Sequence, residues 1–245
     1  MDATTVRHYV PSMARRVALF LWGLSAVGIA LGPSLAVLSW VRPLTGFFLF
    51  VAGAGVGVLC LPAGLVAVRR SKGPARRLAW AATAHGAAVL ALLALGLAGA
   101  RGKPRINDIT TDPEHPPALV AAAHAPDNAG RDLSYPAGNA ELQRAAYPDL
   151  KPIDLPLTPK DAAERARQAA ERLGWRVVSH SPSSLEATDT SKVFHFVDDI
   201  VVRVRPSRDG SVVDVRSKSR DGKGDLGVNA ARIRAFRQAL ESRGG

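Results

Sequence analysis

The residues of this chain that could do chemistry lie in its last third. The segment from Ser219 to Asn229 reads SRDGKGDLGVN, with three glycines among charged and amide side chains just before a predicted helix. Glycine lets a backbone approach a ligand, and a helix N-terminus offers free N–H groups and a positive dipole end to an anion. We therefore expect a site for a phosphate or carboxylate group, for example on a lipid or a wall precursor. Its candidate ligand-binding residues are Ser219, Arg220, Gly222, Asp225, Gly227 and Asn229.

The same segment also has a purely structural interpretation, which stays open. Asp225 is a good N-cap for the predicted helix and is close enough in sequence to pair with Arg220. Asn229 falls on the same helix face as Ile233, so its amide is expected to be buried and to need partners on an adjacent strand. The tetrapeptide Ser-Arg-Asp-Gly also occurs at Ser207 to Gly210, where it predicts the four-residue loop of a hairpin.

A second candidate site lies in the sequence FHFVDD, where His195 precedes Asp198 and Asp199. An imidazole beside a carboxylate can act as a general base or bind a metal. This gives an alternative function, a hydrolase of the cell envelope, which requires the three side chains to converge in one cleft. Neither an HExxH motif nor a nucleophile elbow is present. We therefore expect a non-catalytic protein without a cofactor.

The sequence NDITTDPEHPP contains four residues that could bind a cation: Asp108, Asp112, Glu114 and His115. Carboxylate oxygens suit a hard divalent ion. Turns formed by aspartate side chains between prolines account for the same composition, so no metal is expected here.

The elements that position these residues follow from an uneven composition. Residues 1–100 contain nine Lys or Arg and one acid, while residues 101–245 contain twenty-three Lys or Arg and twenty acids. Three apolar runs fill the first part, at Val17–Val41, Leu44–Val68 and Leu78–Ala100. Because about 20 apolar helical residues cross a bilayer, each is long enough to span it. The basic charge flanks these runs, so the expected partner is the lipid bilayer and not nucleic acid.

The distribution of cations predicts the orientation. Eight Lys or Arg lie before the first span and in the second loop, and four lie on the other side. Since cations near span ends stay in the cytoplasm, residues 1–16 are expected there. The chain is then a multi-pass inner-membrane protein whose C-terminal domain is periplasmic or otherwise extracytoplasmic. An alternative makes the first span a cleaved signal sequence, although it is long for that role.

Small residues within the spans predict close helix packing. Gly28 with Gly32 and Gly53 with Gly57 form two small-xxx-small pairs. His85, the ionisable group well inside a span, favours a structural role, with a small transporter component as the functional alternative. The single cysteine, Cys60, lies in an apolar run and excludes an intrachain disulfide.

After the spans we expect an irregular arm over residues 101–157 and an α+β domain over 158–245, with an antiparallel sheet and two helices packed on one face. Thr158 and Pro159 begin a helix that ends at Gly174. Strands follow at 175–180 and 185–190, then a long hairpin and a helix through Leu240. Opposing charges favour the hairpin register that pairs Arg203 with Asp214.

Two stretches, LEATDTSKVFHFVDDIVVRVRP and DVRSKSRDGKGDLGVNAARIRAF, resemble the DUF1499 family, and NDITTDPEHPP resembles its opening segment. The resemblance covers about residues 106–240. Its most specific part is the closing pattern formed by Ser219, Arg220, Gly222, Asp225, Gly227 and Asn229. The resemblance implies a domain that often follows a membrane segment, and it implies no activity. The expected function is a membrane-anchored envelope protein whose domain binds an anionic lipid, another envelope ligand or a membrane protein partner.

Overall fold

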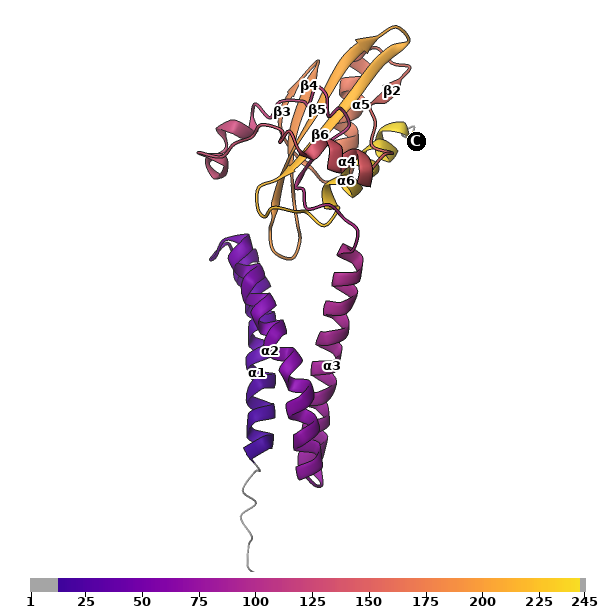
Figure 1. The fold of residues 1–245 in the computed structure, drawn as a ribbon. Coiled ribbons are helices and arrows are strands. Elements are labelled where there is room, and N and C mark those ends of the chain that lie inside the picture. Colours follow the sequence, from indigo (N-terminus) through magenta and orange to yellow (C-terminus); the bar gives the residue numbers. More distant parts are fainter. Residues whose placement is uncertain (1–12, 243–245) are drawn as a thin grey trace, which may run out of the picture. The chain divides into compact units, whose positions relative to one another are not determined.

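Three long helices, α1 (Met13–Val37), α2 (Pro43–Arg70) and α3 (Pro74–Ala100), make up the first part of the chain (Figure 1). The computed structural model describes residues 13–242, so most of the expected cytoplasmic segment 1–16, including Arg7, lies outside the described residues. By length and composition each helix is suited to crossing a bilayer. The three expected apolar helices are confirmed. A second unit begins at Ala100, and each unit is described by itself below.

Glycines bring α1 and α2 into close contact. A Cβ atom added to Gly53 would lie 2.7 Å from the carbonyl carbon of Gly28, and one added to Gly46 would lie 2.6 Å from the carbonyl oxygen of Gly32. Real Cβ atoms are essentially never so close to other atoms, so these backbones meet only because they carry no side chains. The close packing expected at Gly28, Gly32 and Gly53 is confirmed.

A polar contact joins α1 to α3 within the same unit. Nε2 of His85 lies 2.9 Å from the hydroxyl of Ser25, which is fully buried. Gly57 of α2 leaves room for that hydroxyl, which would be 2.7 Å from a Cβ atom at position 57. The Trp22 ring lies beside His85, with 6.5 Å between centroids. His85 therefore links two helices, which agrees with a structural role.

The second unit is built on one six-stranded antiparallel sheet (Figure 1). Its strands are β1 (Asp108–Thr110), β2 (Ile153–Leu155), β3 (Arg176–Ser181), β4 (Ser184–Thr190), β5 (Val197–Ser207) and β6 (Gly210–Ser219). The order is β1-β6-β5-β4-β3, and β2 pairs with β6 further along the same edge as β1. The expected antiparallel sheet is confirmed.

The register of the long hairpin follows its charges. Arg203 of β5 lies opposite Asp214 of β6, and its Nε donates to that carboxylate at 3.0 Å. The slipped alternative would have set Arg203 opposite Arg216, and like charges in that position destabilise a sheet. The predicted register is confirmed.

The loop of this hairpin is shorter than predicted. Ser207 pairs with Gly210, which leaves Arg208 and Asp209 as a two-residue turn in place of the four-residue loop. Gly210 has φ of 137°, and a Cβ atom there would contact the backbone of Pro156 at 3.0 Å. The turn is tight because glycine allows this conformation and because the chain after β2 passes close to it.

Helices α5 (Pro159–Arg172) and α6 (Val228–Glu241) pack against one face of the sheet. The Thr158 hydroxyl accepts a hydrogen bond from the N–H of Asp161 at 3.2 Å, as the predicted cap requires. α5 contacts the sheet through buried alanines, and α6 contributes larger side chains such as Phe236. Trp175 stacks on Phe236 with 5.1 Å between ring centroids. Burial of each large side chain contributes about 1.5–3 kcal/mol.

Residues 101–157 are more ordered than the irregular arm expected from the sequence. They supply β1 and β2, the helix α4 (Asn139–Ala146) and two 3₁₀ turns, η1 (Ala122–His124) and η2 (Pro126–Asn128). Leu119 and Ala122 pack on Val201, on the sheet face opposite α5 and α6. The domain therefore begins well before the expected boundary at residue 158. Three-residue strands produce too little periodicity to be recognised, and their partner β6 is distant in sequence.

Candidate functional site

The loop between β6 and α6, residues 220–227, is held against the segment that enters the domain. The side-chain amide of Asn107 donates to the carbonyl of Gly222 at 2.7 Å. The backbone N–H of Asp225 donates to the carbonyl of Ile106 at 3.2 Å. Two distant parts of the chain, the start of the domain and the closing sequence pattern, therefore form one structure at the end of the sheet where β1 begins and β6 ends.

Buried hydrogen bonds fix the two ends of this loop. Asn229 is fully buried, and its Oδ1 accepts from the Ser217 hydroxyl at 2.7 Å. Its amide nitrogen donates to the carbonyl of Asn107 and to the Ser219 hydroxyl, each at 3.1 Å. The expected buried amide is thus present. Its partners are one backbone carbonyl, two hydroxyls of β6 and the guanidinium of Arg232, whose Nη1 donates to Oδ1 at 2.6 Å.

Asp225 occupies the N-terminus of α6. Its carboxylate accepts hydrogen bonds from the N–H groups of Gly227 at 2.9 Å and Asn229 at 2.7 Å. A carboxylate in this position satisfies free N–H groups and interacts with the helix dipole. The N-cap residue is Gly227, two residues after the expected position, but the Asp225 carboxylate still supplies the capping hydrogen bonds. The helix end therefore already holds a negative group from its own chain.

Arg220 points away from Asp225 and into the other side of the sheet. Its guanidinium makes two bonds to Asp199, at 2.7 and 3.0 Å, and a third to Asp127 at 3.1 Å. These carboxylates raise the pKa of Arg220, with the hydrogen bond to Asp199 as the main cause. The Arg220–Asp225 pair considered from the sequence is absent from the contacts within residues 13–242. Of the six residues of the closing pattern, Ser219 ends β6, Asn229 lies in α6 and the other four lie in the loop between them. Their polar side chains hold this loop in place.

Gly227 marks the place where a polar group lies without a partner. It has φ of +85°, and a Cβ atom there would lie 3.1 Å from the Lys103 side chain and 3.3 Å from the Tyr147 hydroxyl. Tyr147 is only 7% exposed, and within the described part of the chain its hydroxyl has no hydrogen-bond partner. Leaving a buried hydroxyl unpaired costs about 1–3 kcal/mol. Such a group is a candidate contact for a ligand.

The protonation state of Tyr147 suits a donor. Burial raises the pKa of its phenol, and the negative charge of Asp225 raises that pKa further. The phenol therefore keeps its proton at neutral pH. Sequence reasoning missed this residue, because a tyrosine after a short helix carries no signal of its own.

Exposed cations lie on the loops at this end of the sheet. Lys103 and Arg105 lie on the entering segment, Lys223 lies in the closing loop, and Lys192 lies in the loop between β4 and β5. Among residues 13–242, none of the four belongs to an ion pair. The acids of the closing loop are Asp221 and Asp225, both half-buried, and the Asp225 carboxylate caps α6. We call the surface formed by Lys103, Arg105, Lys192 and Lys223, at the end of the sheet that also holds Tyr147, the basic end.

The side chains of the expected hydrolase site do not converge. Asp198 and Asp199 are successive residues of β5 and point to opposite faces of the sheet. Asp198 pairs with Arg232 on the helix side, at 2.6 Å, and Asp199 pairs with Arg220 on the other side. His195 lies before the strand in a left-handed conformation with φ of 56°. The condition set for a hydrolase is therefore not met by this geometry.

The four weak metal candidates are also separated by cationic partners. Asp108 is fully buried between Arg216 and Lys218, with contacts of 2.8 and 2.9 Å. The remaining contacts are Asp112 with Arg203, Glu114 with Arg144, and an exposed His115 at 3.9 Å from Asp112. Across residues 13–242 no three metal-ligating side chains form a group.

Sequence reasoning also missed a buried charged layer on the sheet. Residues such as Asp214, Arg216 and Lys218 alternate along β6 with apolar ones, which is typical of a solvent-exposed face. They are instead covered by residues 111–138, and Tyr135 lies over Arg216 with 5.7 Å from the guanidinium carbon to the ring centroid. Burial raises the pKa of Tyr135 to about 12. Arg216 and Lys218 pair with Asp108, and Asp214 pairs with Arg203 through Oδ2, while its Oδ1 lacks a hydrogen-bond partner among the described residues. The layer has a structural role.

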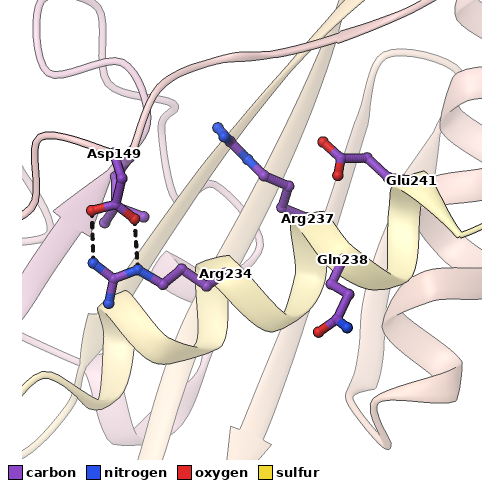
Figure 2. Close-up of a pocket in the computed structure, with 6 residues that line it drawn as sticks. Asp149, Arg234, Arg237, Gln238 and Glu241 are labelled. Carbon is purple, nitrogen blue, oxygen red and sulfur yellow. Dashed lines mark hydrogen bonds and ion pairs between the residues drawn. The ribbon is translucent and has the colours of Figure 1, made fainter.

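Two surface depressions on α6 are too small to be ligand pockets. Figure 2 shows the first, of about 150 Å³, where Arg234 pairs with Asp149 through two hydrogen bonds of 2.6 and 2.7 Å. The second, of about 280 Å³, is lined by Trp175 and Arg232. Sites for small molecules measure about 300–1,000 Å³. The basic end is therefore the better candidate, as a surface for binding.

Comparison with known protein families identifies the C-terminal domain as a whole. A family model described as "Protein of unknown function (DUF1499)" matches residues 108–240, more than half of the chain. The match covers the sheet from β1 onward, the closing loop and nearly all of α6. No curated protein matches the chain.

Proposed function

We propose that this chain, which belongs to the DUF1499 family, is a membrane-anchored, non-catalytic envelope protein. Its ligand is anionic and phosphate-bearing, and it binds at the basic end. The observation that carries the proposal is the Tyr147 hydroxyl, a buried donor without a partner in the described residues, beside the side chain of Lys103. A phosphate oxygen would accept a hydrogen bond from the Tyr147 hydroxyl and attract the ammonium group of Lys103.

The proposed ligand contacts the segment that enters the domain, and not the N-terminus of α6 that the sequence suggested. The N-terminus of α6 is capped by Asp225, and Arg220 is paired with Asp199. These groups position the loop, and the charges that remain available are those of the basic end, Lys103, Arg105, Lys192 and Lys223. The family pattern therefore supports the site without contacting the ligand directly.

The proposed location is the extracytoplasmic side of the inner membrane. This rests on the excess of cations before α1 and between α2 and α3. A phosphatase reporter fused after Gly245 should be active, and a green fluorescent protein fused there should stay dark if export is through the general secretory route. The opposite pattern would place the domain in the cytoplasm and remove the envelope role.

Ligand binding is tested by native mass spectrometry of the full chain, gently solubilised from its own membranes. We expect phosphate-bearing molecules on the wild type, and their loss in Tyr147→Phe and in Lys103→Gln. Lys160→Gln, an exposed charge at the start of α5, is the matched control and should keep them. Equal retention by all four proteins would refute a ligand at Tyr147.

A stability measurement separates a binding role from a structural one. Tyr147→Phe removes only the hydroxyl, and removing an unpaired buried polar group is neutral or stabilising. The ligand-free variant should therefore melt at or above the wild-type temperature. A clear loss of stability in the ligand-free variant would show that the hydroxyl has a partner within the protein and would contradict the proposed contact.

A further inference from the structure

We propose that the ligand of the basic end is the surface of an anionic phospholipid bilayer, with a headgroup phosphate in contact with Tyr147 and Lys103. This inference rests on the proposed function and names its ligand class. It commits to lipid in a membrane, as opposed to a soluble phosphate compound or a protein.

Several loops reach the same end of the sheet. The N–H of Ser219 donates to the carbonyl of Asn107 at 2.8 Å, and the N–H of Arg220 donates to that of Val197 at 3.0 Å. The entering segment, the closing loop and the loop between β4 and β5 are therefore neighbours in the domain (Figure 1). Adjacent strands lie about 4.8 Å apart, so these loops fit within about 15 Å.

Apolar side chains are exposed among the cations of this end. Leu226 is 61% exposed and is one residue from Gly227, Val228 is 50% exposed, and Val193 is 55% exposed next to Lys192. A soluble phosphate compound would give these side chains no apolar surroundings. Exposed apolar residues interleaved with lysine are typical of surfaces that enter the boundary between headgroups and acyl chains.

A short covalent connection joins the domain to a predicted span. α3 is apolar up to Ala100, and only residues 101–107 lie between it and Asp108 of β1. Seven extended residues reach at most about 25 Å. A bilayer crossed by α3 therefore supplies lipid headgroups at very high local concentration to this end of the domain.

The lysine charges of the basic end determine how strongly the domain is expected to dock on an anionic bilayer. A lysine close to an anionic leaflet changes the ratio of docked to undocked protein by about fivefold. Replacing both Lys103 and Lys223 by glutamine should therefore lower the docked ratio by about 25-fold, since the two contributions multiply. Arg208→Gln in the hairpin turn, at the opposite end of the sheet, should leave it unchanged.

The test uses the full chain in nanodiscs, in which both bilayer surfaces are accessible. In a Cys60→Ala background, single cysteines replace Val193, Leu226 or Arg208 and carry an environment-sensitive fluorophore. Quenching by nitroxide-labelled lipids is measured in phosphatidylcholine alone and in its mixture with phosphatidylglycerol. We expect strong quenching at 193 and 226 that increases with phosphatidylglycerol, and weak, composition-independent quenching at 208.

The outcomes separate this inference from the proposed function. Similar quenching at all three positions overturns bilayer docking. If native mass spectrometry nevertheless shows a bound phosphate-bearing molecule, the proposed function stands and its ligand is something other than the bilayer. If quenching at 193 and 226 persists in Tyr147→Phe and Lys103→Gln, the headgroup contact is overturned. Loss of quenching on adding glycerol phosphate would assign the site to a soluble phosphate compound and would also overturn the inference.

Discussion

Replacing Arg232 with methionine should destabilise the C-terminal domain strongly. The Arg232 side chain is 8% exposed, and its Nη2 lies 2.9 Å from Asp189 and 2.6 Å from Asp198. These two aspartates are directly opposite each other on β4 and β5. Because like charges in that position destabilise a sheet, Arg232 both pairs with them and offsets their repulsion. Methionine fills a similar volume but leaves two buried or half-buried carboxylates facing each other.

The expected loss of unfolding free energy is large compared with that caused by a substitution on the surface. Removing one partner of a buried ion pair costs about 3–5 kcal/mol. For a domain of this size that corresponds to a fall in melting temperature of about 10–20 °C. Arg234→Met on the same helix is the matched control, because Arg234 and Asp149 are 46% and 52% exposed and such pairs contribute at most about 1 kcal/mol.

The assay is thermal unfolding of the full chain in neutral detergent, followed by the fluorescence of Trp175. The other tryptophans, Trp22, Trp40 and Trp80, are replaced by phenylalanine, and Trp175 reports on α6 because it stacks on Phe236. Adding Asp198→Asn to Arg232→Met should restore part of the lost stability, because the repulsion between the carboxylates of Asp189 and Asp198 disappears. A melting temperature for Arg232→Met equal to that of the Arg234→Met control would refute the role assigned to the buried pair.

Three further predictions concern other parts of the chain. Asp225→Ala removes the cap of α6 and should cost about 1 kcal/mol in the same unfolding assay; no change would show that the cap contributes nothing. Gly53→Leu should separate α1 from α2 and reduce the yield of monodisperse protein in size-exclusion chromatography, while Gly55→Leu, with open space around it, should not. The hydrogen bonds from Arg234 lower the pKa of Asp149, so their contribution is present at neutral pH and is lost as the pH falls below the ordinary carboxyl range near about 4. Asp149→Asn should therefore lower the melting temperature at neutral pH and make it less sensitive to acid, and an unchanged acid profile would contradict this.

Much of the fold could be predicted because the relevant signals are local. The apolar runs are long enough to define three helices, and Thr158 with Gly174 bounds α5. The hairpin register followed from a single comparison of charges, Arg203 with Asp214 or with Arg216. Each of these inferences needed only neighbours in sequence or one pair of adjacent strands.

The missed elements depend on partners far away in sequence. β1 and β2 are three residues each, and they are strands only because both pair with one edge of β6. Once residues 111–138 cover the other face of the sheet, the charges of β6 become buried, although their alternation is typical of an exposed face. A one-dimensional pattern cannot distinguish a face covered by water from one covered by a distant segment that supplies opposite charges.

The tetrapeptide Ser-Arg-Asp-Gly shows how this limit affects the search for a site. At Ser207–Gly210 its ends pair and its arginine lies exposed in a turn; in its second copy Arg220 is largely buried against Asp199 and its glycine has φ of 78°. The same four residues are used differently because different strands surround them. A motif therefore locates a folded loop, whereas a binding site is located by what remains unsatisfied after folding. Among the described residues of the domain, Oδ1 of Asn128, Oδ1 of Asp214 and the hydroxyl of Tyr147 are buried without a partner. The Tyr147 hydroxyl is the one that lies beside the closing loop, at Gly227, although the residue is outside the motif.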